Sequence, residues 1–460
     1  MSDREFHLAT TPLEKGITFL EASAGTGKTY TISKAVVRLI VEKDLPISSI
    51  LVMTFTEAAT KELKERIRKA IQETLAGLVE VKVEDQLAQH YREEFADSTE
   101  IQKRLRTALA TFDEASIFTI HGFCHRILNE FAFESNQLFE PTLIKEPTPL
   151  WRETIEDYWR KEFYESDGFV SSILEQKNQT PERLLSRLLN LNRYPQLEIL
   201  PPVSDDAFRA TTTGIRSLWK NMHDSFSADR TKLLEILKND GVFKKPLRDK
   251  IPKIQKTTEG TFQTEPSAPW LYAISQLSKE NLESQLMLKH KDTALDVPFF
   301  DLCQAWEIQL VDFIHQHTFY CLRKVQAAFA TTKQSENLLT FDDLLPSILN
   351  TLKSSSGTRL QERIQTNYSA VLIDEFQDTD PQQTELFKRL FVSPDHFLFF
   401  IGDPKQAIYK FRGADIFSYL EARSLAKQSY TLSKNWRSDP RLIDAVNDIF
   451  SNSQVPFLFN

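Results

Sequence analysis

Short runs of apolar, β-branched and aromatic residues recur along the chain, and several are followed by the amphipathic spacing typical of helices. Strands that are apolar on both faces and alternate with helices predict an α/β fold with a doubly wound parallel sheet. In such a sheet, ligands bind at the carboxyl ends of the strands. The predicted strands are 17–22, 49–55, 116–120, 370–376, 397–403 and 429–432.

The pattern changes between residues 145 and 330, which hold most of the tryptophans and have mainly helical spacing. This segment contains none of the strand-then-loop motifs, and strand-like runs resume only at 370. We therefore expect a mainly helical domain inserted into the α/β domain. Within it, residues 240–268 form a polar, proline-bearing stretch.

Composition limits the classes of protein that fit. A chain of 460 residues is too long for one hydrophobic core, so we expect two or three domains. Three scattered cysteines and the absence of a signal-peptide or membrane-spanning run favour a reduced, cytoplasmic protein without a membrane partner. A net charge of -8 argues against nucleic-acid binding by bulk charge, although not against a local basic track.

One local basic track lies in the inserted segment. Six cations accompany a single acid, Asp249, in an otherwise acidic chain. The functional interpretation is contact with duplex phosphates ahead of a fork, and the alternative is a solvated loop. The six are Lys244, Lys245, Arg248, Lys250, Lys253 and Lys256.

The first predicted strand leads into ASAGTGKT, which follows the phosphate-binding pattern G-x-x-x-x-G-K-[ST] with Ala22 in place of the first glycine. In this pattern, backbone N–H groups cradle phosphates, Lys28 reaches the β- and γ-phosphates, and the Thr29 hydroxyl binds magnesium. Ala22 is tolerable if that position does not need a positive φ. The predicted nucleotide-binding residues of this loop are Ala22, Ser23, Ala24, Gly25, Thr26, Gly27, Lys28 and Thr29.

Two later strand ends supply the chemistry that a phosphate loop needs for hydrolysis. Asp374 ends an apolar strand and is a candidate magnesium ligand, and Glu375 beside it is a candidate base for the attacking water. In IGDPKQAIYKFRGADIF (401–417), Gln406 is a candidate γ-phosphate sensor. Tyr409, Phe411 and Arg412 in the same run combine stacking faces with charge, which suits single-stranded nucleic acid, although such aromatics also occur in cores.

Taken in order, the motifs resemble those of the superfamily 1 helicases of the UvrD/Rep type. IDEFQDTDPQQ with GDPKQAIYKFRGADIF is more specifically similar to the RecB-type (beta) subunits of exodeoxyribonuclease V. AddA-type helicase–nucleases rank second, and a free-standing UvrD-like repair helicase is a further alternative. The set is ASAGTGKT, TFTEAATKELKERI, TIHGFC, FDDLL, IDEFQDTDPQQ, GDPKQAIYKFRGADIF and LSKNWRS, and it spans residues 21 to 438.

The resemblance implies a P-loop, RecA-like motor that uses ATP and Mg²⁺, moves 3′ to 5′ on single-stranded DNA and opens duplex ends, with RecC-like and RecD-like subunits as partners. It implies that Lys28, Glu375 and Gln406 act in hydrolysis, that Trp436 stacks on adenine and that Arg437 stabilises the γ-phosphate. Its implied contacts with the DNA strand are Phe55, Thr56, His121, Tyr409, Phe411 and Arg412.

Simpler structural roles stay open for several of these residues. Phe55 also fits a core aromatic, His121 a helix cap, and Asp342 and Asp343 the start of a helix, so the two aspartates are assigned no chemistry. Where this family usually has an adenine-reading glutamine, the nearest candidate is Glu14.

The resemblance also implies a domain order. Residues 1–144 and 331–436 would form the first motor domain, 145–330 the inserted domain, and 437–460 the start of a second motor domain. On this basis we expect an amino-terminal fragment that lacks a nuclease domain. A hypothesis from a different class is a module that binds ATP and DNA without hydrolysis.

Overall fold

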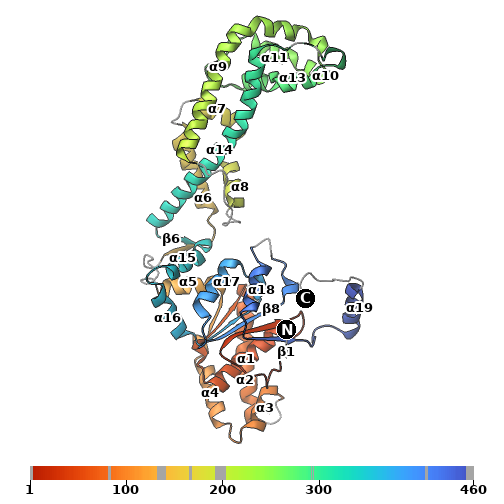
Figure 1. Ribbon diagram of the computed structural model, residues 1–460. Coiled ribbons are helices and arrows are strands. Elements are labelled where there is room, and N and C mark those ends of the chain that lie inside the picture. Colours follow the sequence, from red (N-terminus) through yellow and green to blue (C-terminus); the bar gives the residue numbers. More distant parts are fainter. Residues whose placement is uncertain are drawn as a thin grey trace. The chain divides into compact units, whose positions relative to one another are not determined.

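The computed structural model describes residues 4–80, 84–131, 141–164, 168–191, 204–291, 293, 295–409 and 413–451. The chain divides into two compact units. One comprises Met1–Lys145 with Asn337–Asn460, and the other comprises Glu146–Glu336. Each unit has its own architecture (Figure 1).

The first unit is built on a seven-stranded sheet in the order β1-β9-β2-β8-β7-β3-β4, and all of its strand pairs are parallel. Each of the six predicted strands is present, and the two-residue edge strand β1 was not predicted. The parallel α/β fold class is confirmed. The strands are β1 (Arg4–Glu5), β2 (Gly16–Ala22), β3 (Ile50–Thr54), β4 (Ser116–Thr119), β7 (Ala370–Ile373), β8 (Phe397–Gly402) and β9 (Gln428–Leu432).

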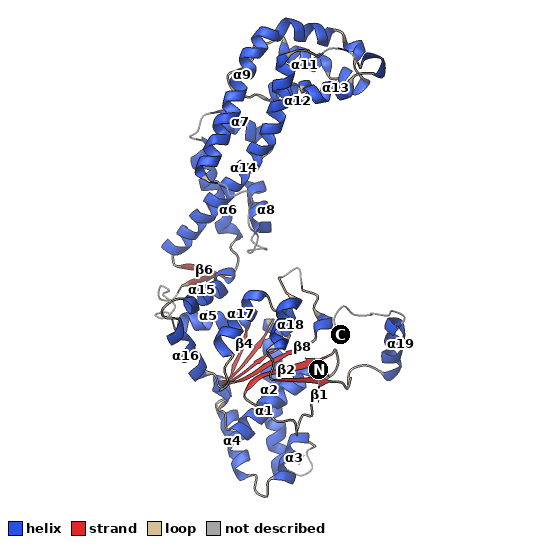
Figure 2. Cartoon of the chain, viewed as in Figure 1, coloured by secondary structure: helices blue, strands red, loops and turns tan. Residues whose placement is uncertain are grey.

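Helices cover both faces of this sheet (Figure 2). Successive side chains of a strand point to opposite faces, so Val52 of β3 joins one hydrophobic core and Met53 joins the other. On the face of Val52 the core helices are α1 (Lys28–Lys43), α2 (Glu57–Val79), α3 (Gln86–Glu94) and α4 (Thr99–Ala110). On the face of Met53 they are α5 (Ile120–Glu130), α15 (Phe341–Lys353), α16 (Gly357–Asn367), α17 (Pro381–Phe391) and α18 (Ile416–Ser424).

Two further elements belong to this unit. A small parallel sheet pairs β5 (Thr142–Ile144) with β6 (Leu338–Thr340), the strands that flank the inserted segment. After β9, the chain forms α19 (Pro440–Ser451). The prediction that 437–460 opens a second motor domain stays a prediction, and 452–460 lie outside the described residues.

The second unit is helical in its described part, as the fold class predicted. Its longest helices, α9 and α14, contribute to one core, while α6, α8 and the C-terminal half of α14 form another. The helices are α6 (Thr148–Trp159), α7 (Gly168–Gln176), α8 (Pro181–Leu191), α9 (Asp205–Lys238), α10 (Lys245–Arg248), α11 (Ile251–Thr258), α12 (Ala268–Leu277), α13 (Lys279–Gln285) and α14 (Pro298–Ser335).

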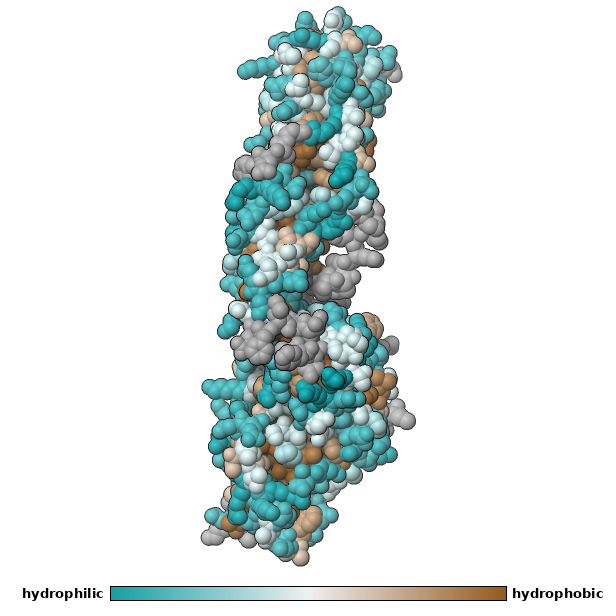
Figure 3. All heavy atoms as spheres, turned by 90° about the vertical axis from the view of Figure 1, so that its left-hand side faces the viewer, coloured by the Kyte–Doolittle hydropathy of each residue, from teal (hydrophilic) through white to brown (hydrophobic). Residues whose placement is uncertain are grey.

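Among the described residues, no helix is long and apolar enough to cross a membrane. On the face drawn in Figure 3, hydrophilic side chains predominate and hydrophobic ones appear as separate spots among the described residues.

Candidate nucleotide and DNA site

The phosphate loop lies between the end of β2 and the start of α1. Gly25 and Gly27 have φ of +80° and +87°, values that favour glycine, and Gly27 is the N-cap of α1. Ala22 is the last residue of β2, is fully buried and is not among the described residues with positive φ. Alanine is therefore tolerable at position 22, because the backbone there does not need a positive φ.

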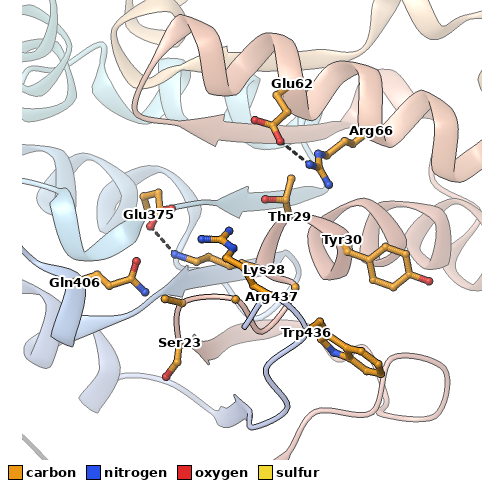
Figure 4. Close-up of a pocket in the computed structure, with 13 residues that line it drawn as sticks. Ser23, Lys28, Thr29, Tyr30, Glu62, Arg66, Glu375, Gln406, Trp436 and Arg437 are labelled. Carbon is orange, nitrogen blue, oxygen red and sulfur yellow. Dashed lines mark hydrogen bonds and ion pairs between the residues drawn. The ribbon is translucent and has the colours of Figure 1, made fainter. Parts of the chain in front are cut away.

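The acidic pair follows β7, which is separated from β2 by a single strand, β8. The backbone N–H of Asp374 donates to the carbonyl of Met53 at 2.8 Å, which fixes the chain beyond the strand end. Glu375 has a φ of +52°, and its Oε2 lies 2.6 Å from Lys28 Nζ. The sheet thus brings together two predicted catalytic groups that are far apart in sequence (Figure 4).

Burial disfavours negative charge on two carboxyl groups here, Asp374 and Asp378. It raises the pKa of Asp374 to about 7, with a further rise from Glu375 and a smaller opposing effect of Lys28. The pKa of Asp378 is raised to about 6, again by burial first and by Glu375 second.

The donor set fits the expected magnesium ion. A bound divalent cation would favour the ionised form of Asp374, and carboxylate and hydroxyl oxygens are the ligands that Mg²⁺ prefers. Asp374 and Thr29 would supply those oxygens.

The third predicted group, Gln406, lies in the short 3₁₀ turn after β8. Its Nε2 donates to Asp403 Oδ2 at 2.7 Å, and the buried Asp403 also accepts from the backbone N–H of Lys405 at 3.0 Å. Gln406 lines the same pocket as Lys28 and Glu375. Its position at the strand end is therefore set by a carboxylate behind the pocket.

The segment after β9 is tied to the phosphate loop. Trp436 donates its backbone N–H to the carbonyl of Gly25 at 2.8 Å, and Asn435 Nδ2 donates to the carbonyl of Ala24 at 3.0 Å. Asn435 Oδ1 in turn accepts the N–H of Arg437 at 2.8 Å. Trp436 is 70% exposed, and Lys434 Nζ lies 3.8 Å from the centroid of its ring. Sequence reasoning missed Asn435, although it stands inside the quoted LSKNWRS.

One pocket of about 320 Å³ is lined by Lys28, Glu375, Gln406, Trp436 and Arg437 together with the phosphate loop. In Figure 4, Lys28, Glu375 and Gln406 lie at one end, and the aromatic side chains of Tyr30 and Trp436 lie at the other. The lining is Ser23, Ala24, Gly25, Gly27, Lys28, Thr29, Tyr30, Glu62, Arg66, Glu375, Gln406, Trp436 and Arg437.

Three of the lining residues were not predicted: Tyr30, Glu62 and Arg66. Glu62 and Arg66 form an i,i+4 ion pair at 2.8 Å on α2, within the quoted TFTEAATKELKERI. The sequence shows both residues as charges on a predicted helix. Which way their side chains point depends on how α2 packs against α1, and the sequence does not show that. Glu14 does not line this pocket and instead pairs with Lys427 at 3.3 Å.

The predicted DNA contacts follow β3, β4 and β8. Phe55 and Tyr409 are half-buried, and their rings stack at 6.0 Å with an interplanar angle of 17°. Thr56 is exposed and accepts the N–H of Ala59 at 3.1 Å as the N-cap of α2.

The neighbouring strand end holds His121, in the first turn of α5, with its ring 6.0 Å from that of Phe341. Because β3 and β4 pair in parallel, with Thr54 opposite Thr119, Phe55 and His121 follow adjacent strand ends. The last two predicted contacts, Phe411 and Arg412, lie outside the described residues.

A doubly wound parallel sheet with a phosphate loop, an Asp-Glu pair and a pocket at its strand ends defines the chain as a P-loop nucleotide-binding protein. The chain belongs to the UvrD/Rep helicase family, because residues 3–427 match the UvrD/REP helicase N-terminal domain. ATP binding and helicase activity are properties of that family.

The chain is also similar to RecB subunits of the RecBCD enzyme. It is 33% identical to that of Escherichia coli K12 over 97% of the chain and 39% of the relative, and 32% identical to that of Haemophilus influenzae over 98% and 41%. For Chlamydia muridarum the figures are 31% identity over 100% and 44%. The chain spans about two-fifths of the length of these relatives. The predicted resemblance to RecB-type proteins is confirmed.

Proposed function

We propose that the chain is the ATP-driven motor region of a RecB-type protein that moves 3′ to 5′ along single-stranded DNA and opens duplex ends for double-strand-break repair. RecC-like and RecD-like subunits would be its partners. The observation that carries the proposal is the convergence of Lys28, Glu375, Gln406 and Arg437 on one pocket. These residues come from four separate segments of the first unit.

Each side chain has a role that follows from its chemistry. Lys28 and the N–H groups of the loop would hold the β- and γ-phosphates, and Thr29 with Asp374 would hold magnesium. Glu375 would accept a proton from the attacking water, and Arg437 would meet charge that develops on the γ-phosphate. The ion pair between Lys28 and Glu375 would have to open for both to act.

The other end of the pocket suits a base. Trp436 is exposed beside the phosphate loop, and Tyr30 lies one residue after Thr29 at the same end (Figure 4). Flat aromatic faces stack on any base. Arg66 would add a cation to the pocket.

The DNA strand would cross the ends of β3, β4 and β8. Phe55 and Tyr409 would offer stacking faces, and Thr56 and His121 hydrogen-bonding groups. Phe411 and Arg412 belong to the same proposal on sequence grounds. Stacking tolerates every base, which is what a motor without sequence preference needs.

A pair of variants tests the ATPase. Lys28→Ala should weaken ATP binding and abolish hydrolysis, because the ammonium that faces the phosphates is lost. Glu375→Gln should retain ATP binding but lower the hydrolysis rate by about 10²- to 10⁴-fold, the usual contribution of a general base. ATP affinity and steady-state hydrolysis, each with and without single-stranded DNA, measure both effects.

Hydrolysis by the Glu375→Gln variant at the parent rate would refute Glu375 as the base. ATP and DNA binding without any turnover by the parent chain would instead support the non-hydrolytic module. The AddA-type and free-standing helicase alternatives differ in partners, so co-purification with RecC-like and RecD-like subunits separates them from the RecB type.

A further inference from the structure

Gln377 lies behind the nucleotide pocket and contacts Glu375, the proposed base, from the protein side. It is 2% exposed and follows Glu375 by two residues. Its Nε2 donates to Glu375 Oε2 at 2.8 Å and, more weakly, to Asp378 Oδ2 at 3.3 Å. Its Oε1 accepts the backbone N–H of Asp403 at 3.0 Å. One buried amide therefore joins the ends of β7 and β8.

These contacts fix the orientation of the amide. A carboxylate accepts and a backbone N–H donates, so only the NH₂ group can face Glu375 and only the oxygen can face Asp403. Glutamate at this position would keep the acceptor for Asp403 but set a second carboxylate against Glu375. Methionine would fill similar space and make neither hydrogen bond.

The end of β8 is shaped to receive this side chain. A Cβ on Gly402 would lie 2.5 Å from Gln377 Oε1 and 3.2 Å from the Gln377 backbone nitrogen, so only glycine fits without displacement. The next residue, Asp403, holds Gln406 by a 2.7 Å hydrogen bond. The contacts thus run continuously from Glu375 through Gln377 and Asp403 to Gln406.

The two ends of this path, Glu375 and Gln406, both line the pocket, and Glu375 also accepts a hydrogen bond from Lys28. In the described part of the chain, Glu375 Oε2 has two side-chain donors, Lys28 at 2.6 Å and Gln377 at 2.8 Å. If Lys28 turns to phosphates, the amide of Gln377 stays to hold the carboxylate.

We propose that Gln377 is a positioning residue that couples the conformation of Asp403–Gln406 to the orientation of Glu375. A ligand that contacts Gln406 would then change the orientation of Glu375, and a change in Glu375 would alter the conformation of Asp403–Gln406. The identity of the ligand as ATP rests on the proposed function. The hydrogen-bonded path itself does not depend on it.

The test compares Gln377→Met and Gln377→Glu with a matched control, Gln383→Met. Gln383 is a buried glutamine whose Oε1 accepts the Asp380 N–H at 3.4 Å in the capping box of α17, and it does not line the pocket. Amide hydrogen exchange at Asp403–Gln406 is measured with and without magnesium and ATPγS. Nucleotide affinity and single-turnover ATP hydrolysis are measured on the same proteins.

In the free protein, Gln377→Met should speed exchange at the Asp403 amide about tenfold or more, and Gln377→Glu should not. In the parent and in Gln383→Met, ATPγS should change exchange across this segment. In Gln377→Met it should bind with affinity within about threefold of the parent yet leave exchange of the Asp403 amide, whose acceptor is gone, unchanged. Hydrolysis should fall about tenfold or more in both Gln377 variants, because a hydrogen bond to a charged group is lost or replaced by repulsion.

The outcomes separate this proposal from the proposed function. Parent-like exchange and hydrolysis in Gln377→Met would overturn the coupling and leave the ATPase intact. A parent that binds ATPγS without hydrolysis would count against the motor, while the exchange measurements would still decide the coupling. Equal losses in Gln383→Met would assign the effect to general destabilisation and overturn the proposal.

Discussion

Gly25 is the residue at which two independent constraints meet. Its φ of +80° is costly for other L-residues, and a Cβ there would lie 2.9 Å from Arg437 Cβ and from the side-chain amide of Asn435. Gly25→Ala should therefore destabilise the protein by about 1–2 kcal/mol and weaken ATP binding about tenfold, because the loop and the Arg437 segment must move apart. Thermal unfolding and nucleotide titration measure the two effects.

Gly214 provides the matched control. It is exposed in α9, and a Cβ there would meet nothing within 4 Å. Gly214→Ala should leave ATP affinity unchanged and stabilise the protein by up to about 1 kcal/mol, the helix-propensity difference. Unchanged ATP affinity in Gly25→Ala would show that the link between the phosphate loop and Arg437 is unimportant for binding.

Sequence motifs predicted the residues that converge on the pocket but not those that position them. Lys28, Glu375 and Gln406 follow strand ends, so the parallel fold alone brings them to one edge of the sheet. Gln377 and Asn435 were not predicted, because they act through hydrogen bonds to residues that are distant in the sequence, and no periodic pattern in the sequence indicates such bonds. The simpler interpretation of Asp342 and Asp343 is confirmed, since both lie in the first turn of α15 and Asp343 completes its capping box.

Among the secondary-structure elements, the sequence predicted best the strands that are buried on both faces of the sheet. The long apolar runs became the central strands, whereas β1, β5 and β6 have only two or three residues and too little pattern to detect. The polar stretch 240–268 contains two helices, α10 and α11, which carry the basic track, so the alternative that this track is a loop is wrong. Two of its three prolines, Pro246 and Pro252, lie in first turns, where proline favours a helix.

The basic track on α10 and α11 carries a prediction of its own. Leu247, Ile251 and Ile254 are buried, and the six cations lie on the exposed surface of the same segment. Reversing Lys245, Arg248 and Lys256 to glutamate should weaken duplex binding and lower the slope of log K against log salt by up to about three phosphates. Duplex affinity across a salt series measures this, and basal ATP hydrolysis should not change.

The control for this prediction reverses three exposed cations of α9, Arg209, Lys220 and Lys232, with the same change in net charge. If both triple variants weaken duplex binding equally, general charge rather than the α10–α11 track is responsible. If the α10–α11 variant binds duplex with the affinity of the parent at low salt, the cations of the track are solvent-exposed side chains that do not contact the duplex.

At the scale of the whole chain, each unit has its own hydrophobic cores. The two cores that flank the parallel sheet contain no residue from Glu146–Glu336, and the two cores of the helical unit contain none from outside it. The nucleotide pocket is likewise lined only by the first unit. The change of pattern in the sequence near 145 and 330 reflects this division, since a helical insert needs a core of its own.

Separate cores predict that the first unit folds without the second. Replacing Glu146–Glu336 with about eight glycine and serine residues should suffice, because β5 and β6 are paired neighbours and the Cα atoms of Ile144, where β5 ends, and Leu338, where β6 begins, are only about 8 Å apart. The shortened protein should bind ATP within about twofold of the parent and unfold cooperatively, yet lose the duplex binding that depends on α10 and α11. Nucleotide titration and calorimetry measure this, with Lys28→Ala in the shortened protein to show that binding is at the pocket. A shortened protein that is folded but no longer binds ATP would mean that the helical unit organises the nucleotide site, contrary to the independence of the cores.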